Sequence, residues 1–265
     1  MRIISFINEK GGVGKTTTVV NTAYFLAKAG HKVLMVDFDP QASATSIIGL
    51  GSGHIDNPDT FTSYDIFYGN FNPTKDMQSK YGVDVIPADD RLAGIEMAKP
   101  NGGRKERILS EFFKNHKFDY DFVLLDCKGA IGLLTINALV ASTDLVVVMQ
   151  SQYLSLEGFP KLLKTVNTIK SDLGIRPKML GILVTMFNKG HMQDTRQLEK
   201  IKKSGLQSLL FDTVIRTNTT LSSASESAVP VGVYDPSCRG SMDYMAFSEE
   251  FVKRINEGWV KNDRN

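Results

Sequence analysis

The sequence predicts an α/β fold in which a doubly wound, mostly parallel sheet has helices on both faces. Short β-branched, apolar segments alternate with segments of helical periodicity along most of the chain. This alternation is the pattern of right-handed crossovers between parallel strands. No internal repeat and no linker rich in Gly, Ser or Pro divides the 265 residues. We therefore expect one domain over residues 1–265.

The expected strands are continuous apolar runs, as is typical of strands that are buried on both faces of a sheet. They cover Ile3–Ile7, Lys32–Asp37, Val83–Pro87, Phe122–Asp126, Leu145–Met149 and Leu180–Met186. Between these runs, apolar residues recur at helical spacing. The expected helices cover Thr16–Ala29, Arg104–Lys114, Ile131–Ala141, Leu156–Leu173 and Met192–Ser204.

Two other segments have recognisable patterns. Residues 49–72 are rich in Gly, Asn, Asp and Thr and weakly periodic, which predicts surface structure. Segment Ser241–Lys261 carries aromatic and aliphatic residues at helical spacing, which predicts a terminal helix packed on the sheet.

The composition excludes several classes of protein. With 31 Lys and Arg against 29 Asp and Glu, 42% hydrophobic residues and a net charge of +2, the chain is neither collagen-like nor disordered. This charge is too small to predict nucleic-acid binding from composition alone. The two cysteines fall in no zinc or disulfide pattern, and no apolar run has the length of a membrane span. We therefore expect a cytoplasmic protein.

The loop after the first expected strand has the residues of a phosphate-binding loop. It leads into a helix and reads Lys10-Gly11-Gly12-Val13-Gly14-Lys15-Thr16-Thr17. Glycines let the backbone N–H groups turn inward around a phosphate, with the positive end of the helix beneath it. We expect Lys15 to reach the β- and γ-phosphates and the Thr16 hydroxyl to bind Mg²⁺. The predicted nucleotide-binding residues here are Gly11, Gly12, Val13, Gly14, Lys15, Thr16 and Thr17.

Carboxylates follow or end two further expected strands. Asp37 and Asp39 lie two residues apart and so point to one face of the chain at the end of the second strand. Asp126 closes an apolar strand and has the form of a Walker B acid, which predicts Mg²⁺ binding. Parallel strands end at one edge of the sheet, where α/β folds bind their ligands.

The loop departs from the strict Walker pattern, because Glu9 stands where a glycine is expected and Lys10 follows it. At this point the sequence resembles the deviant Walker A ATPases of the ParA/MinD family, closest to the ParA (Soj-like) partition branch. Recognisable pieces extend from Arg2 to about Phe251. The resemblance implies a P-loop NTPase fold and an ATPase that uses ATP and Mg²⁺.

The resemblance also implies roles for individual residues. Lys10 is expected to be the signature lysine that reaches the phosphates of the other subunit in an ATP-sandwich homodimer. Asp39 is expected to position the attacking water, and Asp37 to help organise Mg²⁺, so that Lys10, Lys15 and Asp39 are the expected catalytic residues. Met186 falls where the family's adenine-contacting strand end lies, and we expect it to contact the base.

One departure from the family pattern lies directly after Asp126. The family continues with two prolines, whereas this chain has Lys128 and Gly129. Prolines stiffen a loop, whereas Gly129 loosens it and Lys128 adds a positive charge near the γ-phosphate. Two interpretations stay open: either the loop switches differently here, or the substitution is tolerated.

The resemblance further implies sequence-independent DNA binding through Arg and Lys of the C-terminal third. The family stretch Ile-Pro-Arg-Asn-x-Arg-Leu-Ser reads Ile215-Arg216-Thr217-Asn218-Thr219-Thr220-Leu221-Ser222 here, so threonine replaces both family arginines. We therefore expect a weaker or displaced binding surface. The named DNA-binding candidates are Arg216, Lys253 and Arg254, among a larger set that includes Lys189, Arg196, Lys200, Lys202, Lys203 and Arg239.

The leading hypothesis is a partition or positioning ATPase that is associated with the nucleoid and with no membrane. A ParB-like or other cargo adaptor is expected to stimulate hydrolysis. The alternative is a MinD-like, membrane-associated ATPase, but Gly258 and the polar residues after it form a poor membrane helix. An iron–sulfur relative is a third class, for which Cys127 has no neighbouring thiol. The sequence does not specify the cargo.

Overall fold

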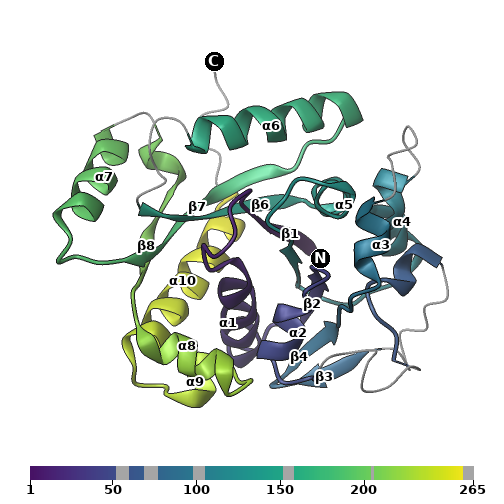
Figure 1. Cartoon of the computed structure of the whole chain (residues 1–265), viewed down its shortest axis with the longest axis horizontal. Helices are drawn as coiled ribbons and strands as arrows, with labels where there is room; N and C mark the ends of the chain where they lie inside the picture. The colour runs from purple at the N-terminus through teal and green to yellow at the C-terminus, as the bar shows by residue number, and fades with distance from the viewer. Residues whose placement is uncertain (52–59, 69–76, 98–104, 152–157, 204–205, 259–265) are drawn as a thin grey trace.

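The structure is built around one large sheet. The computed structural model describes residues 1–51, 60–68, 77–97, 105–151, 158–203 and 206–258. In this part of the chain the strands pair in the order β3-β4-β2-β5-β1-β6-β7-β8 (Figure 1). Every described pair is parallel except β3 with β4, which is antiparallel. The predicted doubly wound, mostly parallel α/β fold is confirmed.

All the expected strands are present, with ends that shift by a few residues. They are β1 (Arg2–Ile7), β2 (Val33–Phe38), β4 (Val83–Ile86), β5 (Phe122–Cys127), β6 (Asp144–Gln150) and β7 (Lys178–Phe187). Two strands at the edges of the sheet were not predicted, β3 (Gln78–Lys80) and β8 (Leu210–Arg216).

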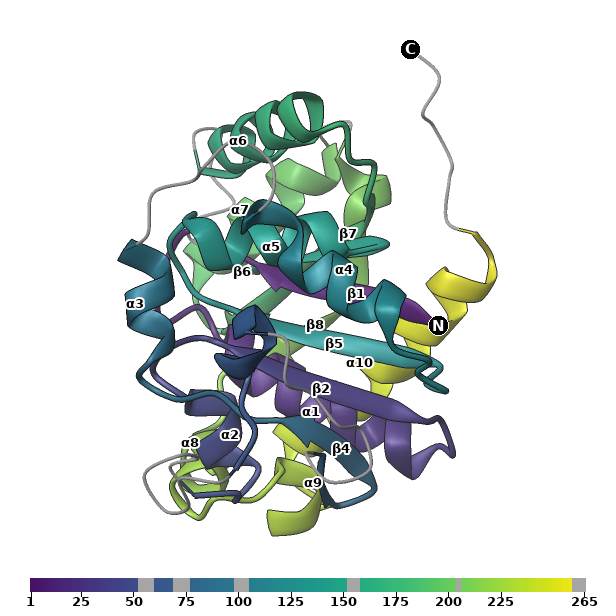
Figure 2. The same ribbon diagram turned by 90° about the vertical axis from the view of Figure 1, so that its right-hand side faces the viewer.

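Helices cover both faces of the sheet (Figure 2). One core contains residues of α3 (Leu92–Met97), α4 (Ile108–Asn115), α5 (Leu133–Ala141), α6 (Gly158–Leu173) and α7 (Met192–Lys203). The other contains residues of α1 (Lys15–Lys28), α2 (Ser43–Ile47), α8 (Thr219–Glu226), α9 (Val231–Tyr234) and α10 (Arg239–Asn256). Short 3₁₀ helices lie between some of these elements: η2 (Asp65–Tyr68), η3 (Lys105–Arg107) and η5 (Gln207–Leu209).

Alternation along β1 explains the two cores. Ile3 and Ile7 pack in the first core, whereas Ile4 and Phe6 pack in the second. Successive side chains of a strand point to opposite faces, so an unbroken apolar run supplies both cores at once.

Helix α1 connects the second core to the loop after β1. Its residues Val19, Val20, Ala23 and Leu26 are all buried and recur at helical spacing against the sheet. The helix ends before Gly30, whose φ of 92° is left-handed and favours glycine. Burial of this apolar stripe fixes the start of α1, and with it the loop that precedes it.

Some boundaries and environments differ from the predictions. Phe61 and Ile66 are buried in the first core, so the prediction of surface structure for residues 49–72 is wrong at these positions. The described part of α10 ends at Asn256, before the predicted end at Lys261. Residues 52–59, 69–76, 98–104, 152–157, 204–205 and 259–265 lie outside the described residues, and they include parts of predicted helices.

Carboxylates of α10 close the outer edge of β8. Glu250 accepts hydrogen bonds from the backbone N–H groups of Asp212 at 2.8 Å and Thr213 at 2.9 Å. Asp243 accepts one from the N–H of Arg216 at 2.9 Å. These bonds fix the edge strand to the terminal helix. None of the helices in the described ranges is long and apolar enough to cross a membrane.

Candidate active site

The loop between β1 and α1 adopts a backbone that requires glycine. Gly12 has a φ of 71° and Gly14, directly before the helix, a φ of 86°. Side chains other than glycine rarely adopt such angles, so these two positions explain the glycine-rich sequence. The side chain of Asn8 ties down the start of the loop, because it donates to Val148 O at 2.7 Å and accepts from the N–H of Lys10 at 2.9 Å.

Lys15 is a buried cation at the start of α1. It is 7% exposed, and its Nζ donates to the carbonyl oxygen of Lys10 at 3.1 Å. Burial lowers the pKa of the Lys15 ammonium, while Asp126, the Cys127 thiol and Asp39 act in the opposite direction. An ammonium that is held by one carbonyl and enclosed by the loop is well placed to bind an anion.

Asp126 lies one residue before the end of the central strand β5 and has a buried carboxylate. It is 1% exposed, and neither of its oxygens has a hydrogen-bond partner of normal geometry among the described residues. Burial, followed by the nearby Asp37, raises the pKa of Asp126 well above its usual range, while the Thr16 hydroxyl and Lys15 act against this rise. A buried polar group without a partner is costly, and a cation that binds these oxygens would remove the cost.

The donor set around Asp126 fits Mg²⁺. A carboxylate and the neighbouring Thr16 hydroxyl are hard oxygen ligands, which Mg²⁺ prefers together with phosphate oxygens and water. The unpartnered oxygens of Asp126 are the observation that supports this fit. The predicted magnesium residues Thr16 and Asp126 therefore lie together.

Asp37 lies beside Asp126 but is already occupied by hydrogen bonds. The two residues are register partners in β2 and β5. Asp37 Oδ2 accepts from the N–H and the hydroxyl of Thr45, both at 2.8 Å, and Oδ1 accepts from the N–H of Asp39 at 3.2 Å. Burial is the main cause that raises the pKa of Asp37 to about 6. Its visible role is to fix the turn after β2, and its predicted role at Mg²⁺ stays a prediction.

Asp39 is half-buried in the turn that Asp37 fixes. Its Oδ1 accepts from the N–H of Gln41 at 3.1 Å. Asp39 is close enough to Lys15 to counteract the lowering of the lysine's pKa. The geometry thus places a carboxylate, held by its own turn, next to the expected phosphate site.

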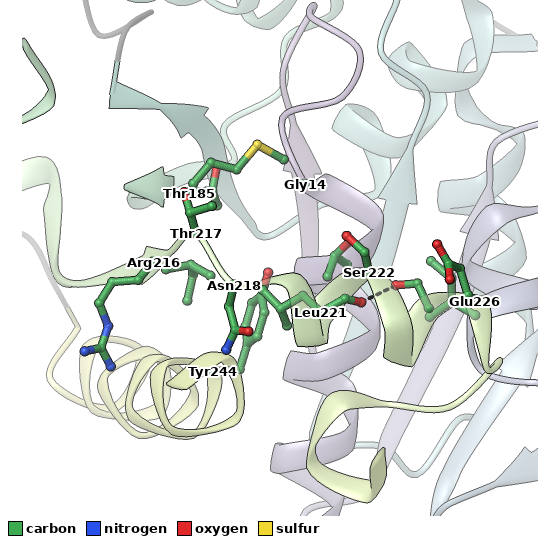
Figure 3. Close-up of a pocket in the computed structure, with 14 residues that line it drawn as sticks. Gly14, Thr185, Arg216, Thr217, Asn218, Leu221, Ser222, Glu226 and Tyr244 are labelled. Carbon is green, nitrogen blue, oxygen red and sulfur yellow. Dashed lines mark hydrogen bonds between the residues drawn. The ribbon is translucent and has the colours of Figure 1, made fainter. Parts of the chain in front are cut away.

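A pocket of about 500 Å³ opens beside the end of the loop (Figure 3). Gly14 and Thr17 form the wall nearest the loop, and Met186, at the end of β7, contributes to another wall. Met186 is 45% exposed and has a φ of 51°, a strained angle for this residue. Lining residues that the sequence analysis did not assign to this site include Ile47, Thr185, Thr217, Asn218 and Tyr244.

The pocket contains residues that come from distant parts of the chain. Asn218 caps α8 by accepting from the N–H of Thr220 at 2.9 Å, and Tyr244 of α10 bonds the Thr18 hydroxyl of α1 at 3.2 Å. The Asn218 cap was available as a sequence signal, since Asn before a helix is a common N-cap. No local signal pointed to Tyr244, because only the fold brings α10 next to α1.

The chain is similar to known proteins over most of its length. Residues 1–179 match the family described as an AAA domain. The sporulation initiation inhibitor protein Soj of Bacillus subtilis is 36% identical over 251 residues, which cover 94% of this chain and 97% of that protein. The chromosome-partitioning ATPase Soj of Treponema pallidum is 33% identical over 255 residues, which cover 96% and 98%. The chain belongs to the ParA/MinD family.

The fold gives the same relationship. The structure of cobyrinic acid a,c-diamide synthase from Mycobacterium smegmatis, with a bound ATP analogue and magnesium, matches with a TM-score of 0.79. The match is 26% identical in sequence and covers 97% of this chain and 96% of that chain. The P-loop NTPase fold expected from the sequence is therefore confirmed.

The family's signature lysine, Lys10, is exposed at the start of the loop. Its backbone is fixed by Asn8 and its carbonyl oxygen accepts from Lys15. The role expected from the resemblance requires this side chain to extend beyond the nucleotide of its own subunit, and an exposed position on a fixed backbone is compatible with that role. The role itself stays a prediction.

The three named DNA-binding candidates of this ParA/MinD chain have different environments. Arg216 forms a two-point ion pair with Asp243, in which Nε donates at 3.0 Å. Figure 3 shows its side chain beside α10, pointing away from Gly14. Lys253 is the exposed member, with a side chain 68% accessible and Glu257 at 3.9 Å.

Arg254 requires a correction. It is 4% exposed, its guanidinium lies 4.0 Å from the Phe211 ring centroid, and it donates to Glu250 at 3.1 Å and to Leu180 O at 3.3 Å. It also donates to Leu210 O. A side chain enclosed in this way holds β8 against α10 and is not presented to a DNA phosphate. The helical pattern of the terminal segment did not reveal this, because three acceptors of Arg254 are carbonyl oxygens outside that segment, at Leu180, Leu209 and Leu210.

Proposed function

We propose that residues 1–265 form one domain of a partition or positioning ATPase. In this proposal ATP closes two copies into an ATP-sandwich homodimer, and the dimer holds DNA without sequence preference. A ParB-like or other adaptor on the cargo stimulates hydrolysis and so releases the dimer from the nucleoid. The observation that carries the ATPase part is the buried carboxylate of Asp126, which lies near Lys15 and Thr16 and has no hydrogen-bond partner of normal geometry among the described residues.

The protein is an ATPase, with ATP and Mg²⁺ as its ligands. The Treponema pallidum relative is named a chromosome-partitioning ATPase, and the Mycobacterium smegmatis synthase holds an ATP analogue and magnesium. In this chain, the glycine loop and Lys15 offer groups that suit the phosphates of ATP, and Asp126 offers oxygens that suit Mg²⁺.

Each part of the site then has a task. The loop N–H groups and Lys15 bind the phosphates, while Thr16 and Asp126 hold Mg²⁺, which neutralises phosphate charge when it is bound. Asp39, fixed by the turn after β2, orients the attacking water and accepts its proton. The pocket beside Gly14 has the volume and the partly apolar lining for the nucleoside, with Met186 at its rim.

Lys10 supports the dimer part of the proposal. Two bound triphosphates that face each other across an interface repel, and a cation from each subunit on the other's phosphates turns this repulsion into attraction. Lys10 is exposed, at the rim of its own phosphate loop. The dimer is therefore expected only with ATP.

Helix α7 supports the DNA part better than the end of α10 does. Arg196, Lys200 and Lys203 are exposed and recur at four- and three-residue spacing, so they share one face of the helix. Lys189, before the helix, and Lys202 are also exposed. A basic helix face of this kind binds the phosphate backbone without reading sequence. Dimerisation doubles the number of contacts on one rigid body, which couples DNA affinity to ATP.

A gel-shift experiment tests this function. Two unrelated DNA duplexes are titrated with the protein and Mg²⁺, in the presence of ATP, ADP or no nucleotide, over a range of salt concentrations. We expect equal binding of both duplexes with ATP, a steep loss with salt and weak binding otherwise. Equal binding without nucleotide, or none at low salt when the dimer has formed, contradicts the DNA-carrier function.

A further inference from the structure

The loop between β5 and α5, residues 128–132, lies against the phosphate loop. A Cβ atom placed on Gly129 would lie 3.5 Å from the backbone nitrogen of Gly11 and 3.5 Å from Nζ of Lys15. The N–H of Gly11 and the ammonium of Lys15 are both expected to bind phosphate, and Gly129 approaches them from the side of β5. This is the position where the chain departs from the prolines of the sequences that it resembles.

Gly129 and the pocket lie at opposite ends of the phosphate loop. The pocket is lined by Gly14 and Thr17, at the end of the loop. Gly129 lies near the beginning of the loop, where a Cβ atom placed on it would meet the backbone of Lys10 and Gly11. A nucleotide whose base occupies the pocket extends its phosphates along the loop towards Gly129. The terminal phosphate of the nucleotide, which ATP has and ADP lacks, is thus the phosphate closest to Gly129.

Lys128 and Gly129 both have unused hydrogen-bonding capacity. Lys128 is half-buried and lines a narrow cavity with Asn8 and Gly129, and its ammonium has no hydrogen-bond or ion-pair partner among the described residues. Within the same part of the chain, the N–H of Gly129 donates to no backbone carbonyl. A partly buried ammonium without an anion and a donor without an acceptor, side by side, fit a ligand with negative charge.

We propose that Lys128 and Gly129 bind the terminal phosphate of ATP, Gly129 through its backbone N–H and Lys128 through its ammonium. This inference rests on the proposed ATPase function and adds a specificity element to it. The pair discriminates between ATP and ADP within one subunit, because only ATP extends far enough to engage it.

The substitution of both prolines is needed for this role. Proline has no backbone N–H, so a Pro-Pro pair at these positions offers the phosphate neither a donor nor a charge. Gly129 supplies the donor, which proline at this position lacks.

The experiment compares the affinities of the full chain for ADP and for a non-hydrolysable ATP analogue, both with Mg²⁺, by calorimetry. Gly129→Pro removes the N–H, and Gly129→Ala keeps it with a Cβ at ordinary contact distances. Lys128→Ala removes the charge, and Lys178→Ala, at the exposed start of β7, is the matched control. Hydrogen bonds to charged groups predict a loss of about tenfold or more in analogue affinity for Gly129→Pro and Lys128→Ala. The affinity of these two variants for ADP, and both affinities of Lys178→Ala, are expected to stay within about twofold of the wild type. Gly129→Ala is expected to lose less analogue affinity than Gly129→Pro, because it keeps the N–H.

The outcomes separate this inference from the proposed function. If Lys128→Ala binds the ATP analogue as tightly as the wild type does, the role of the ammonium is overturned. This test does not depend on whether Gly129→Pro folds. Equal losses in Gly129→Ala and Gly129→Pro overturn the role of the N–H, because the shape of the loop would then be responsible. If the wild-type protein itself binds neither nucleotide, the proposed function fails. If it binds both and no variant discriminates between them, only this inference fails.

Discussion

Replacing Asp39 is expected to affect ATP hydrolysis but not nucleotide binding. Its carboxylate is fixed by the turn after β2 and lies near Lys15 without belonging to the phosphate loop. Asp39→Ala is expected to reduce phosphate release at least about a hundredfold, the usual contribution of a general base. The affinity for ADP should change little. Phosphate release and nucleotide titration on the same sample measure the two effects.

A matched control for Asp39 is Asp90, an exposed carboxylate outside the site. Asp90→Ala should hydrolyse ATP at the wild-type rate. If Asp39→Ala does so too, Asp39 only caps its turn, and the water must be oriented by another group.

Asp126 gives a prediction about stability as well as binding. Its buried oxygens lack hydrogen-bond partners of normal geometry among the described residues. Replacement by the neutral isostere in Asp126→Asn should raise the free energy of unfolding at pH 8 by about 1–3 kcal/mol, because an unpaired buried carboxylate is removed. Urea unfolding without nucleotide or metal measures this change.

The same variant tests the magnesium role of Asp126. In the wild type, ADP with Mg²⁺ should raise the melting temperature more than ADP alone does. In Asp126→Asn this difference should disappear. A variant that is less stable and still responds fully to Mg²⁺ would contradict both roles.

At the residue scale, the sequence predicted the site residues whose position depends only on neighbouring residues in the chain. Lys15, Thr16 and Asp126 follow from a loop and a strand end, and the structure brings them together. Arg254 was misassigned because its burial depends on carbonyl groups of other strands. Pairing partners far along the chain are invisible in a single sequence, so the surface charges were the least predictable part of the site.

At the element scale, helix α7 carries the testable part of the DNA hypothesis. The triple substitution Arg196→Ala, Lys200→Ala, Lys203→Ala removes its basic face. Each lost phosphate contact should reduce the slope of log affinity against log salt by about 0.9. Binding by the ATP-bound dimer should therefore weaken on all duplexes alike. Fluorescence anisotropy over a salt series measures the slope.

The control for α7 removes the same charge from another region of the surface. Lys114, Lys117 and Lys178 are exposed and lie outside α7. Their combined change to alanine should leave the slope nearly unchanged. If both triple variants lose the same affinity, the effect comes from net charge and not from a defined surface.

Which elements the sequence predicted depends on their place in the sheet. Central strands such as β1 and β5 are continuous apolar runs, because both of their faces are buried. The edge strand β8 has exposed and half-buried residues from Asp212 to Val214 within it, and β3 has only three residues, so neither has that pattern. The short helices α2 and α9 are set by packing and capping in the fold, which periodicity over so few residues does not indicate.

At the scale of the whole molecule, Lys10 is expected to determine assembly. In an Asp39→Ala background, which retains bound ATP, light scattering should show a monomer without nucleotide and a dimer with ATP and Mg²⁺. Adding Lys10→Ala should abolish the dimer, because the cation that pairs with the other subunit's phosphates is lost. Nucleotide binding by the monomer should persist, since Lys15 and the loop remain.

Two results would reject this role of Lys10. One is a dimer of the Lys10→Ala variant that forms at the same protein concentration as its parent. The other is a loss of nucleotide binding in the monomer, which would place Lys10 on the nucleotide of its own subunit.

The closed edge of β8 limits how other proteins are recruited. Many proteins capture an extended peptide by adding it to a sheet as a further strand, which requires free N–H groups along the edge. Here Glu250 and Asp243 occupy the N–H groups of Asp212, Thr213 and Arg216. At the opposite edge, β3 offers only three residues as a template. An extended peptide that binds the described part of this chain is therefore expected to dock on side chains instead of adding a strand, and the closed edge also disfavours edge-to-edge association between copies of the chain.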